Sequence, residues 1–229
     1  MPAYRILIAD DHPLMRAALR QAVAQTLPDA ELIEAGGFSQ VMETTAARHD
    51  GIDLILLDLH MPGMNGFIGL FLLRGEHPAI PIIVVSALED TVTIQRSLEY
   101  GASGFVPKSA PIETIAKALH TVLDGGDWFP EMEGASPPVA NPPEPGFADR
   151  IASLTPQQLR VLAGITSGKL NKQIAYEMSV SEATVKAHVT VILRKLGLHS
   201  RTQVIIAAGR LVVEAPGDEA PGPSARRVS

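Results

Sequence analysis

The chain contains no cysteine, and this absence excludes two kinds of site. Without cysteine there can be neither a disulfide framework nor a reactive thiolate. The seven histidines show no H-x-x-x-H spacing and no H-E-x-x-H motif, so a zinc enzyme is unsupported. A Walker loop and a G-x-S-x-G motif are missing as well, and with them the usual signatures of a nucleoside triphosphatase and of a serine hydrolase.

Long apolar runs and an export signal are also missing. The longest apolar stretch, residues 80–88, contains Pro81 and is too short to span a bilayer. Residues 1–5 lack the basic and then apolar layout of an export signal. We therefore expect a cytoplasmic protein that does not act at a membrane.

Charge is distributed very unevenly along the chain. The 229 residues, of which 46% are hydrophobic, suit two small domains better than one large domain. Residues 1–127 carry a net charge of -8, residues 128–149 of -4, residues 150–212 of +7 and residues 213–229 of -1. An acidic N-terminal domain suggests metal and phosphate chemistry, and a basic C-terminal domain suggests a polyanionic partner.

Short apolar runs alternate with longer helix-like stretches over residues 1–127. The five runs span residues 6–9, 31–35, 54–57, 82–85 and 104–106. This alternation predicts an α/β fold, in which a doubly wound five-stranded parallel sheet carries helices on both faces. We expect Pro13 to open the first helix and Pro111 the fifth, and residues 61–66, rich in proline and glycine, to form a turn.

Three carboxylates follow two of these runs: Asp10 and Asp11 come after the first, and Asp58 comes after the third. If the runs are neighbouring parallel strands, the three acids meet at the carboxyl edge of the sheet, where such folds bind ligands. Carboxylates about 5 Å apart repel by roughly 3 kcal/mol per pair at an effective dielectric near 20, so the cluster needs a bound cation. Mg²⁺, a hard cation that prefers oxygen, fits best.

Two further polar residues are expected at the same edge, because Ser86 ends the fourth run and Lys108 follows the fifth. A hydroxyl and an ammonium group would suit the charged equatorial oxygens of a phosphoryl group. Asp58 would then be the nucleophile, with the metal held by Asp10 and Asp11, and the product would be an aspartyl phosphate. Each residue alone could be an ordinary loop residue, but their common place at the strand ends favours a functional interpretation.

The two regions outside the predicted domains have a different composition. Residues 128–149 are rich in proline between positions 133 and 146, which predicts a semi-stiff linker of polyproline character. Residues 213–229 contain three more prolines and are expected to be a disordered tail.

The basic segment, residues 150–212, contains the start signals of four helices. Residues 155–158 and 200–203 fit capping boxes, and Asn171 and Ser181 are suitable N-caps. The third helix, residues 182–196, has an apolar stripe that should face a core; it comprises Val185, Val189, Ile192 and Leu196. The opposite face is small, polar and cationic, with Ala183, Ala187, Thr190 and Arg194 in its centre and Lys186 on its flank.

That outer face suits the major groove of DNA. Lys186 or Arg194 could bond guanine edges, and Ala187 or Thr190 could contact a thymine methyl group. Three other cations near helix ends are expected to contact phosphates: Lys172, Lys195 and Arg201. Thr184, on the same helix as Lys186, completes the predicted DNA-binding set. The simpler alternative is a solvated basic face on a small helical bundle.

The acidic half resembles a known domain family. Asp10-Asp11, the string D-L-H-M-P-G-M-N-G from Asp58, Ser86-Ala87, and G-F-V-P-K ending at Lys108 are similar to the receiver domain of response regulators over residues 1–125. The resemblance implies the strand order 2-1-3-4-5 and phosphotransfer with Mg²⁺ from a sensor histidine kinase to Asp58. It also implies a switch in which Ser86 and Phe105 shift when the phosphoryl group arrives.

The basic half resembles a second family. The strings N-K-Q-I-A from Asn171, S-E-A-T-V-K-A-H-V from Ser181, and L-R-K-L-G-L-H-S-R-T-Q over residues 193–203 are similar to a LuxR-type helix-turn-helix domain spanning about residues 153–212. The resemblance implies that the helix with Lys186, Ala187 and Thr190 reads bases. It also implies that the last helix pairs two protomers through Val204, Ile205 and Ala208.

A receiver followed by a LuxR-type domain resembles the NarL/FixJ response regulators. This implies a homodimerising transcription factor that is controlled by phosphorylation, and whose switch either releases or dimerises the DNA-binding domains. We do not expect the protein to be an enzyme, except that the receiver should assist its own phosphorylation and dephosphorylation. Two alternatives remain, a Mg²⁺-dependent phosphatase-like enzyme and a phosphorylation-gated module that binds an acidic protein, but neither explains both halves of the charge distribution.

Overall fold

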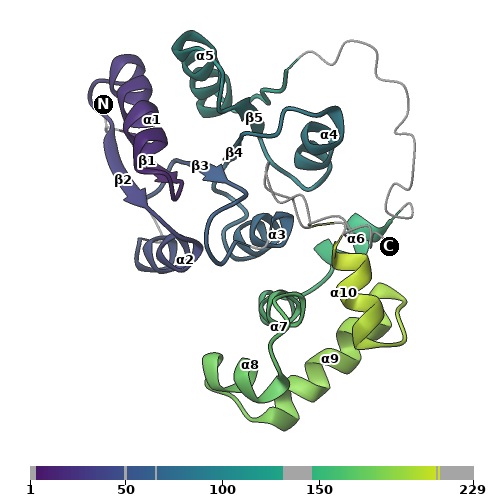
Figure 1. Cartoon of the computed structure of the whole chain (residues 1–229). Helices are drawn as coiled ribbons and strands as arrows, with labels where there is room; N and C mark the ends of the chain where they lie inside the picture. The colour runs from purple at the N-terminus through teal and green to yellow at the C-terminus, as the bar shows by residue number, and fades with distance from the viewer. Residues whose placement is uncertain (1–3, 49–50, 65, 131–145, 210, 212–229) are drawn as a thin grey trace, which may run out of the picture.

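The computed structural model of the chain describes residues 4–48, 51–64, 66–130, 146–209 and 211. Most of the predicted proline-rich linker, residues 131–145, and the predicted tail, residues 213–229, lie outside the described residues. Two domains are described, an N-terminal α/β domain and a C-terminal helical domain (Figure 1).

The N-terminal domain is built on a five-stranded parallel sheet with the order β2-β1-β3-β4-β5, which confirms the predicted fold class. The strands are β1 (Arg5–Ala9), β2 (Glu31–Ala35), β3 (Leu54–Asp58), β4 (Ile82–Ser86) and β5 (Gly104–Pro107). Every predicted apolar run is a strand. Three strands extend one residue further than expected at their carboxyl ends, so that Asp58 and Ser86 belong to the sheet itself.

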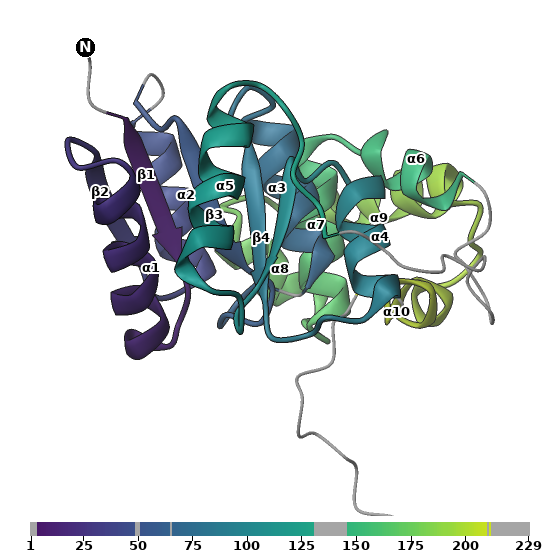
Figure 2. The same ribbon diagram turned by 90° about the horizontal axis from the view of Figure 1, so that it is seen from above.

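Helices cover both faces of this sheet, which is why its strands are almost continuously apolar. One face packs against α1 (Pro13–Thr26) and α5 (Ile112–Leu123), and the other against α2 (Phe38–Ala47), α3 (Phe67–Glu76) and α4 (Thr91–Glu99). Figure 2 shows α1 and α5 in front of the sheet and α2 and α3 behind it. Successive residues of β1 alternate between the two cores, as the pleat requires: Ile6 and Ile8 face α1, while Leu7 lies in the core on the other face.

The predicted turns and helix starts are largely confirmed. Pro13 is the first residue of α1, whereas Pro111 is the N-cap of α5 rather than its first helical residue. The described residues between 61 and 66 form the expected turn before α3. Trp128, which falls in the range predicted as linker, instead pairs with the edge strand: its carbonyl accepts a hydrogen bond of 2.8 Å from the Phe105 amide. This close approach favours glycine at position 104, because a β-carbon there would lie only 3.0 Å from the Trp128 oxygen.

The C-terminal domain contains the four predicted helices and one that was not predicted. They are α6 (Phe147–Ala152), α7 (Pro156–Thr166), α8 (Asn171–Glu177), α9 (Glu182–Leu196) and α10 (Arg201–Gly209). The unpredicted α6 begins within the range assigned to the linker. The predicted caps at Thr155 and Ser181 are confirmed, since each side-chain oxygen accepts a hydrogen bond from the backbone N–H three residues later.

The predicted N-cap at Asn171 is wrong. The N-cap position is Leu170, and Asn171 is the first residue of α8. The Asn171 side chain has a different role, because its oxygen accepts a hydrogen bond of 3.1 Å from the Arg201 guanidinium at the start of α10. Asn171 therefore joins α8 to α10 instead of closing the first turn of α8.

The two domains meet through α3, which lies beside α7 (Figures 1 and 2). Residues 67–73 of α3 are all buried, since one side of the helix faces the sheet and the other faces the C-terminal domain. Across this contact, Arg160 Nη2 lies 2.7 Å from Glu76 Oε1, and the Phe67 N–H donates to the Leu211 carbonyl at 3.0 Å. One apolar core therefore runs from the sheet through α3 into the helical domain.

Candidate functional site

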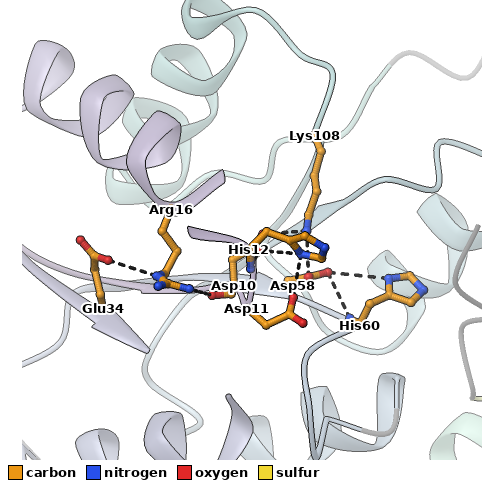
Figure 3. Close-up of polar contacts among 8 residues, drawn as sticks. All are labelled: Asp10, Asp11, His12, Arg16, Glu34, Asp58, His60 and Lys108. Carbon is orange, nitrogen blue, oxygen red and sulfur yellow. Dashed lines mark hydrogen bonds and ion pairs between the residues drawn. The ribbon is translucent and has the colours of Figure 1, made fainter. Parts of the chain in front are cut away.

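The carboxyl edge of the sheet brings the predicted acidic residues together. Ala9 is paired with Leu57 in the strand register, so Asp10 follows beside Asp58. Both carboxylates are fully buried, as is Ser86 at the end of β4. Lys108 reaches in from the loop after β5, and its Nζ lies 2.7 Å from Asp10 Oδ2 and 2.8 Å from Asp58 Oδ2 (Figure 3). The ammonium group thus bridges the two buried acids.

The environment of Asp58 keeps its carboxylate ionised. Burial alone would raise the pKa of Asp58, but hydrogen bonds from His60 and Lys108 and the charge of Lys108 outweigh burial and leave the pKa below its ordinary value. The His60 backbone N–H donates to Asp58 Oδ1 at 3.1 Å. The pKa of Lys108 is raised, because its contacts with Asp10 and Asp58 outweigh the opposing effect of burial. Both shifts favour the charged forms, as expected for a nucleophilic carboxylate beside a fixed cation.

The acidic cluster fits a divalent cation. One ligand atom from each of Asp10, Asp11, His12 and Asp58 lies within 4.8 Å of the others. Among the described residues, Asp10 Oδ2 and Asp11 Oδ1 are buried carboxylate oxygens that accept no regular hydrogen bond, although each has an ion-pair contact. Three carboxylates offer the hard oxygen donors that Mg²⁺ prefers. His12 was not among the predicted metal ligands, although its position directly after Asp10-Asp11 was a usable signal.

Ser86 links the loops that border this site. Its carbonyl accepts a hydrogen bond of 2.7 Å from the Lys108 backbone, and its hydroxyl accepts one of 3.1 Å from the Leu88 N–H. The Ser109 hydroxyl donates to the Glu89 carboxylate, which joins the loop after β5 to the loop after β4. Ser86 therefore lies where a change at Asp58 would reach both loops.

Phe105, the predicted partner of Ser86 in a switch, is completely buried in the core on the α3 side of the sheet. A shift of its side chain would begin from this enclosed position. Because Phe105 has no hydroxyl group, such a shift would change the packing of the core and no hydrogen bond of the side chain. The switch role of Phe105 stays a prediction.

The structure separates the two faces of α9 as the sequence pattern indicated. Val185, Ile192 and Leu196 are buried, and Val189 is partly buried. The outer face is exposed to solvent in the present arrangement of the domains; its residues are Ala183, Thr184, Lys186, Ala187, Thr190 and Arg194. Lys186 Nζ lies 3.1 Å from Glu182 Oε1, an exposed pair that a phosphate or a base could displace at small cost. A small, cationic helix face is thus open for contact with a polyanion.

The other three predicted DNA contacts differ in their surroundings. Lys172 is exposed on α8. Lys195 instead donates hydrogen bonds of 2.7 Å to the Ser153 carbonyl and 3.1 Å to Gln158 Oε1, and Arg201 contacts Asn171 and the Lys169 carbonyl. Lys195 and Arg201 therefore hold the helices of the domain together, and a role of either in DNA binding stays a prediction.

The predicted dimerisation residues on α10 do not share one surface. Val204 and Ala208 are buried inside the domain, whereas Ile205 and its neighbour Ile206 are 40% and 66% exposed. In this arrangement a second protomer could reach the two isoleucines, but not Val204 or Ala208. Ile206 was not among the residues predicted from the sequence.

Comparison with known families now identifies the two domains. Residues 6–120 match the response regulator receiver domain, and residues 152–208 match the luxR family of bacterial regulatory proteins. The chain belongs to the LuxR-type response regulators. This response regulator is therefore a transcription regulator in which a receiver precedes a DNA-binding domain, and the phosphatase-like and protein-interaction alternatives are not favoured.

Similar proteins align with nearly the whole chain. The regulator is 42% identical over 211 residues to the glycerol metabolism activator of Pseudomonas putida, a match that covers 90% of this chain and 95% of that protein. It is 34% identical over 208 residues to the nitrate/nitrite response regulator protein NarL of Escherichia coli strain K12, covering 88% and 93% respectively.

A solved structure has the same fold. RcsB from Salmonella enterica serovar Typhimurium, bound to promoter rprA in the presence of phosphomimetic BeF3-, superposes with a TM-score of 0.52 at 19% identity and covers 91% of this chain and 100% of that one. At this identity the likeness concerns the fold alone. Within the described part of the regulator, no helix combines the length and apolar character that crossing a membrane requires.

Proposed function

We propose that this regulator accepts a phosphoryl group on Asp58 from a sensor histidine kinase and thereby controls its binding to promoter DNA as a homodimer in the cytoplasm. The observation that carries the proposal is the Asp58 carboxylate itself. It is fully buried, lies 2.8 Å from the Lys108 ammonium, and has ligand atoms of Asp10 and Asp11 within 4.8 Å.

The chemistry follows from the charges around Asp58. An ionised oxygen of Asp58 attacks phosphorus, and the bond from phosphorus to the donor histidine nitrogen breaks, with its electron pair leaving on the imidazole. Asp10, Asp11 and Asp58 would hold Mg²⁺, which when bound neutralises the phosphoryl oxygens. Lys108 would move its hydrogen bond from Asp58 to a phosphoryl oxygen, and the Ser86 hydroxyl would donate to another.

DNA recognition is assigned to the exposed face of α9. Lys186, Ala187, Thr190 and Arg194 would enter the major groove, and Lys172 would contact a phosphate. Because the receiver leaves this face uncovered, the arrangement supports dimerisation, rather than uncovering of the face, as the step that phosphorylation controls. Ile205 on α10 is the predicted contact residue that a second protomer could reach.

The loop after Asp58 offers a route between the two sites. It leads directly into α3, and α3 packs against α7 of the DNA-binding domain. A change at the acceptor would therefore be transmitted to the helical domain through a packed helix pair and the Glu76–Arg160 ion pair.

The acceptor is tested by incubating the full-length protein with a small acyl phosphate donor and Mg²⁺, and measuring the incorporated phosphate. We expect the wild type to be labelled and Asp58→Asn to take up none. Asp53→Asn, which changes an acid at the opposite end of the same sheet, serves as the matched control. Undiminished labelling of Asp58→Asn would refute the assignment of the acceptor.

A further inference from the structure

An arginine outside the acidic cluster holds the backbone of that cluster in place. Arg16, in the first turns of α1, donates from Nη1 to the Asp10 backbone carbonyl at 2.7 Å. Its Nε donates to Glu34 Oε2 on β2 at 3.1 Å, and Arg20 Nη1 donates to the other oxygen of Glu34 at 3.2 Å. Figure 3 shows Arg16 and Glu34 on the side of Asp10 that faces away from His60.

This contact fixes the direction of a peptide plane. The Asp10 carbonyl and the Asp11 N–H belong to one planar peptide unit, so holding the carbonyl also orients the backbone from which the Asp11 side chain leaves. The Asp10 N–H donates to the Ala35 carbonyl at 3.1 Å, and Asp10 Oδ1 accepts from the His12 N–H at 2.8 Å. In both of these contacts the donor is a neutral backbone N–H, whereas Arg16 adds a charged donor, and a charged partner makes a hydrogen bond stronger.

Glu34 keeps the guanidinium group in this orientation. Because Nε is paired with Glu34 and Nη1 with the Asp10 carbonyl, the planar group is fixed at two points. A lysine could not make both contacts with the same geometry, since its ammonium is a single centre. The Arg16 side chain is only 20% exposed, which limits competition by water.

We propose that Arg16 is a positioning residue for the metal site, which orients the Asp10–Asp11 peptide and is itself anchored by Glu34. The proposal rests on the proposed function, because it takes the acidic cluster to bind Mg²⁺. The Arg16 side chain contacts the Asp10 carbonyl and Glu34, and it would touch neither the cation nor the phosphoryl group. It acts through the backbone of two ligands.

A positioning role and a purely electrostatic role of Arg16 predict opposite changes in Mg²⁺ affinity when Arg16 is removed. If Arg16 acted only through its charge, its removal would take a cation away from a cation-binding site and would strengthen Mg²⁺ binding. If Arg16 orients Asp10 and Asp11, its removal weakens Mg²⁺ binding, by about 10-fold if it acts as residues that orient metal ligands commonly do. Arg16→Lys provides a second way to distinguish the two roles, because lysine retains the positive charge but loses the two-point contact.

The experiment measures the Mg²⁺ dissociation constant of the full-length protein by calorimetric titration. We expect Arg16→Met and Arg16→Lys each to bind Mg²⁺ about 10-fold more weakly than the wild type. Arg20→Met is the matched control, since it removes an equal charge that contacts Glu34 but not Asp10; we expect a change of less than about twofold. The thermal unfolding midpoint of each variant verifies that it is folded.

Unchanged or tighter Mg²⁺ binding by Arg16→Met would overturn the positioning role and leave the proposed function intact. Wild-type affinity in Arg16→Lys, with weaker binding in Arg16→Met, would also overturn it, because a single ammonium contact would then suffice and the two-point contact anchored by Glu34 would not be needed. A wild-type protein that binds no Mg²⁺ would instead contradict the proposed metal site. The failure of the two proposals is thus distinguishable.

Discussion

The bridge that Lys108 makes between Asp10 and Asp58 allows one perturbation to be worked through in detail. In Lys108→Met the ammonium is replaced by an apolar group of similar length, and the two buried carboxylates lose the cation that lies 2.7 and 2.8 Å from them. Their ligand atoms are within 4.8 Å, and two unit charges at that separation repel by about 3 kcal/mol at an effective dielectric near 20.

The expected loss of stability has the same size. Removing one partner of a buried ion pair costs about 3–5 kcal/mol, and the low end applies because the Lys108 side chain is 16% exposed. We therefore expect the unfolding free energy of metal-free Lys108→Met at neutral pH to be about 3 kcal/mol below that of the wild type. The measurement is urea unfolding in the presence of a chelator.

The pH dependence should change sign. In the wild type the pKa of Asp58 is lowered, so its stabilising contribution is present above the ordinary pKa of 3.8 and is lost as the pH falls through the lowered value. Without Lys108, burial and the neighbouring carboxylate should raise the pKa of Asp58 above its ordinary value. We therefore expect the variant to lose stability as the pH rises from about 4 to 7, and we expect no such loss for the wild type.

Magnesium provides the last comparison. We expect about 10 mM Mg²⁺ to stabilise Lys108→Met more than the wild type, because no ammonium group competes for the carboxylates. Lys117→Met on the exposed side of α5 is the control, with an expected change within about 0.5 kcal/mol. If Lys108→Met had the wild-type pH profile and did not respond to Mg²⁺, the inferred electrostatics of the site would be wrong.

Two further predictions concern the DNA-binding domain. Ser179, in the turn between α8 and α9, has a φ of 54°, and we expect Ser179→Gly to raise the unfolding free energy by about 0.5 kcal/mol, seen as a higher melting temperature. The same change at Ser167, with φ of -76°, should not stabilise; equal effects at both sites would contradict the argument. Lys172→Ala should weaken binding to all DNA duplexes alike and reduce the salt dependence of the affinity, whereas Lys186→Ala should also relax the preference for particular bases. Both effects can be measured by band shifts on random and selected DNA at several salt concentrations. Equal loss of base preference in the two variants would contradict the assigned roles.

Local patterns in the sequence determined most of the framework. The apolar runs predicted the five strands because fully covered parallel strands are apolar on both faces. Asp58 and Ser86 were placed at the carboxyl edge because the ends of parallel strands meet there. The spacing of Val185, Ile192 and Leu196 likewise identified the buried side of α9, since three to four residues make one helical turn.

Contacts between distant segments were decided only by the tertiary structure. The all-apolar residues 67–73 indicate a helix that is buried on every side, but only the structure shows that α7 covers its outer face. The burial of Val204 and the bond from Arg201 to Asn171 depend in the same way on how α10 packs against the helices before it.

In the acidic site, too, some features follow from local sequence and others from the tertiary structure. Its residues could be named from the ends of the strands, because strand periodicity and parallel pairing act over short stretches of chain. The bridge by Lys108 and the hydrogen bond from Arg16 to the Asp10 carbonyl could not be predicted, because each joins groups on different structural elements. Such bonds are set by the packing of those elements, which no local pattern encodes.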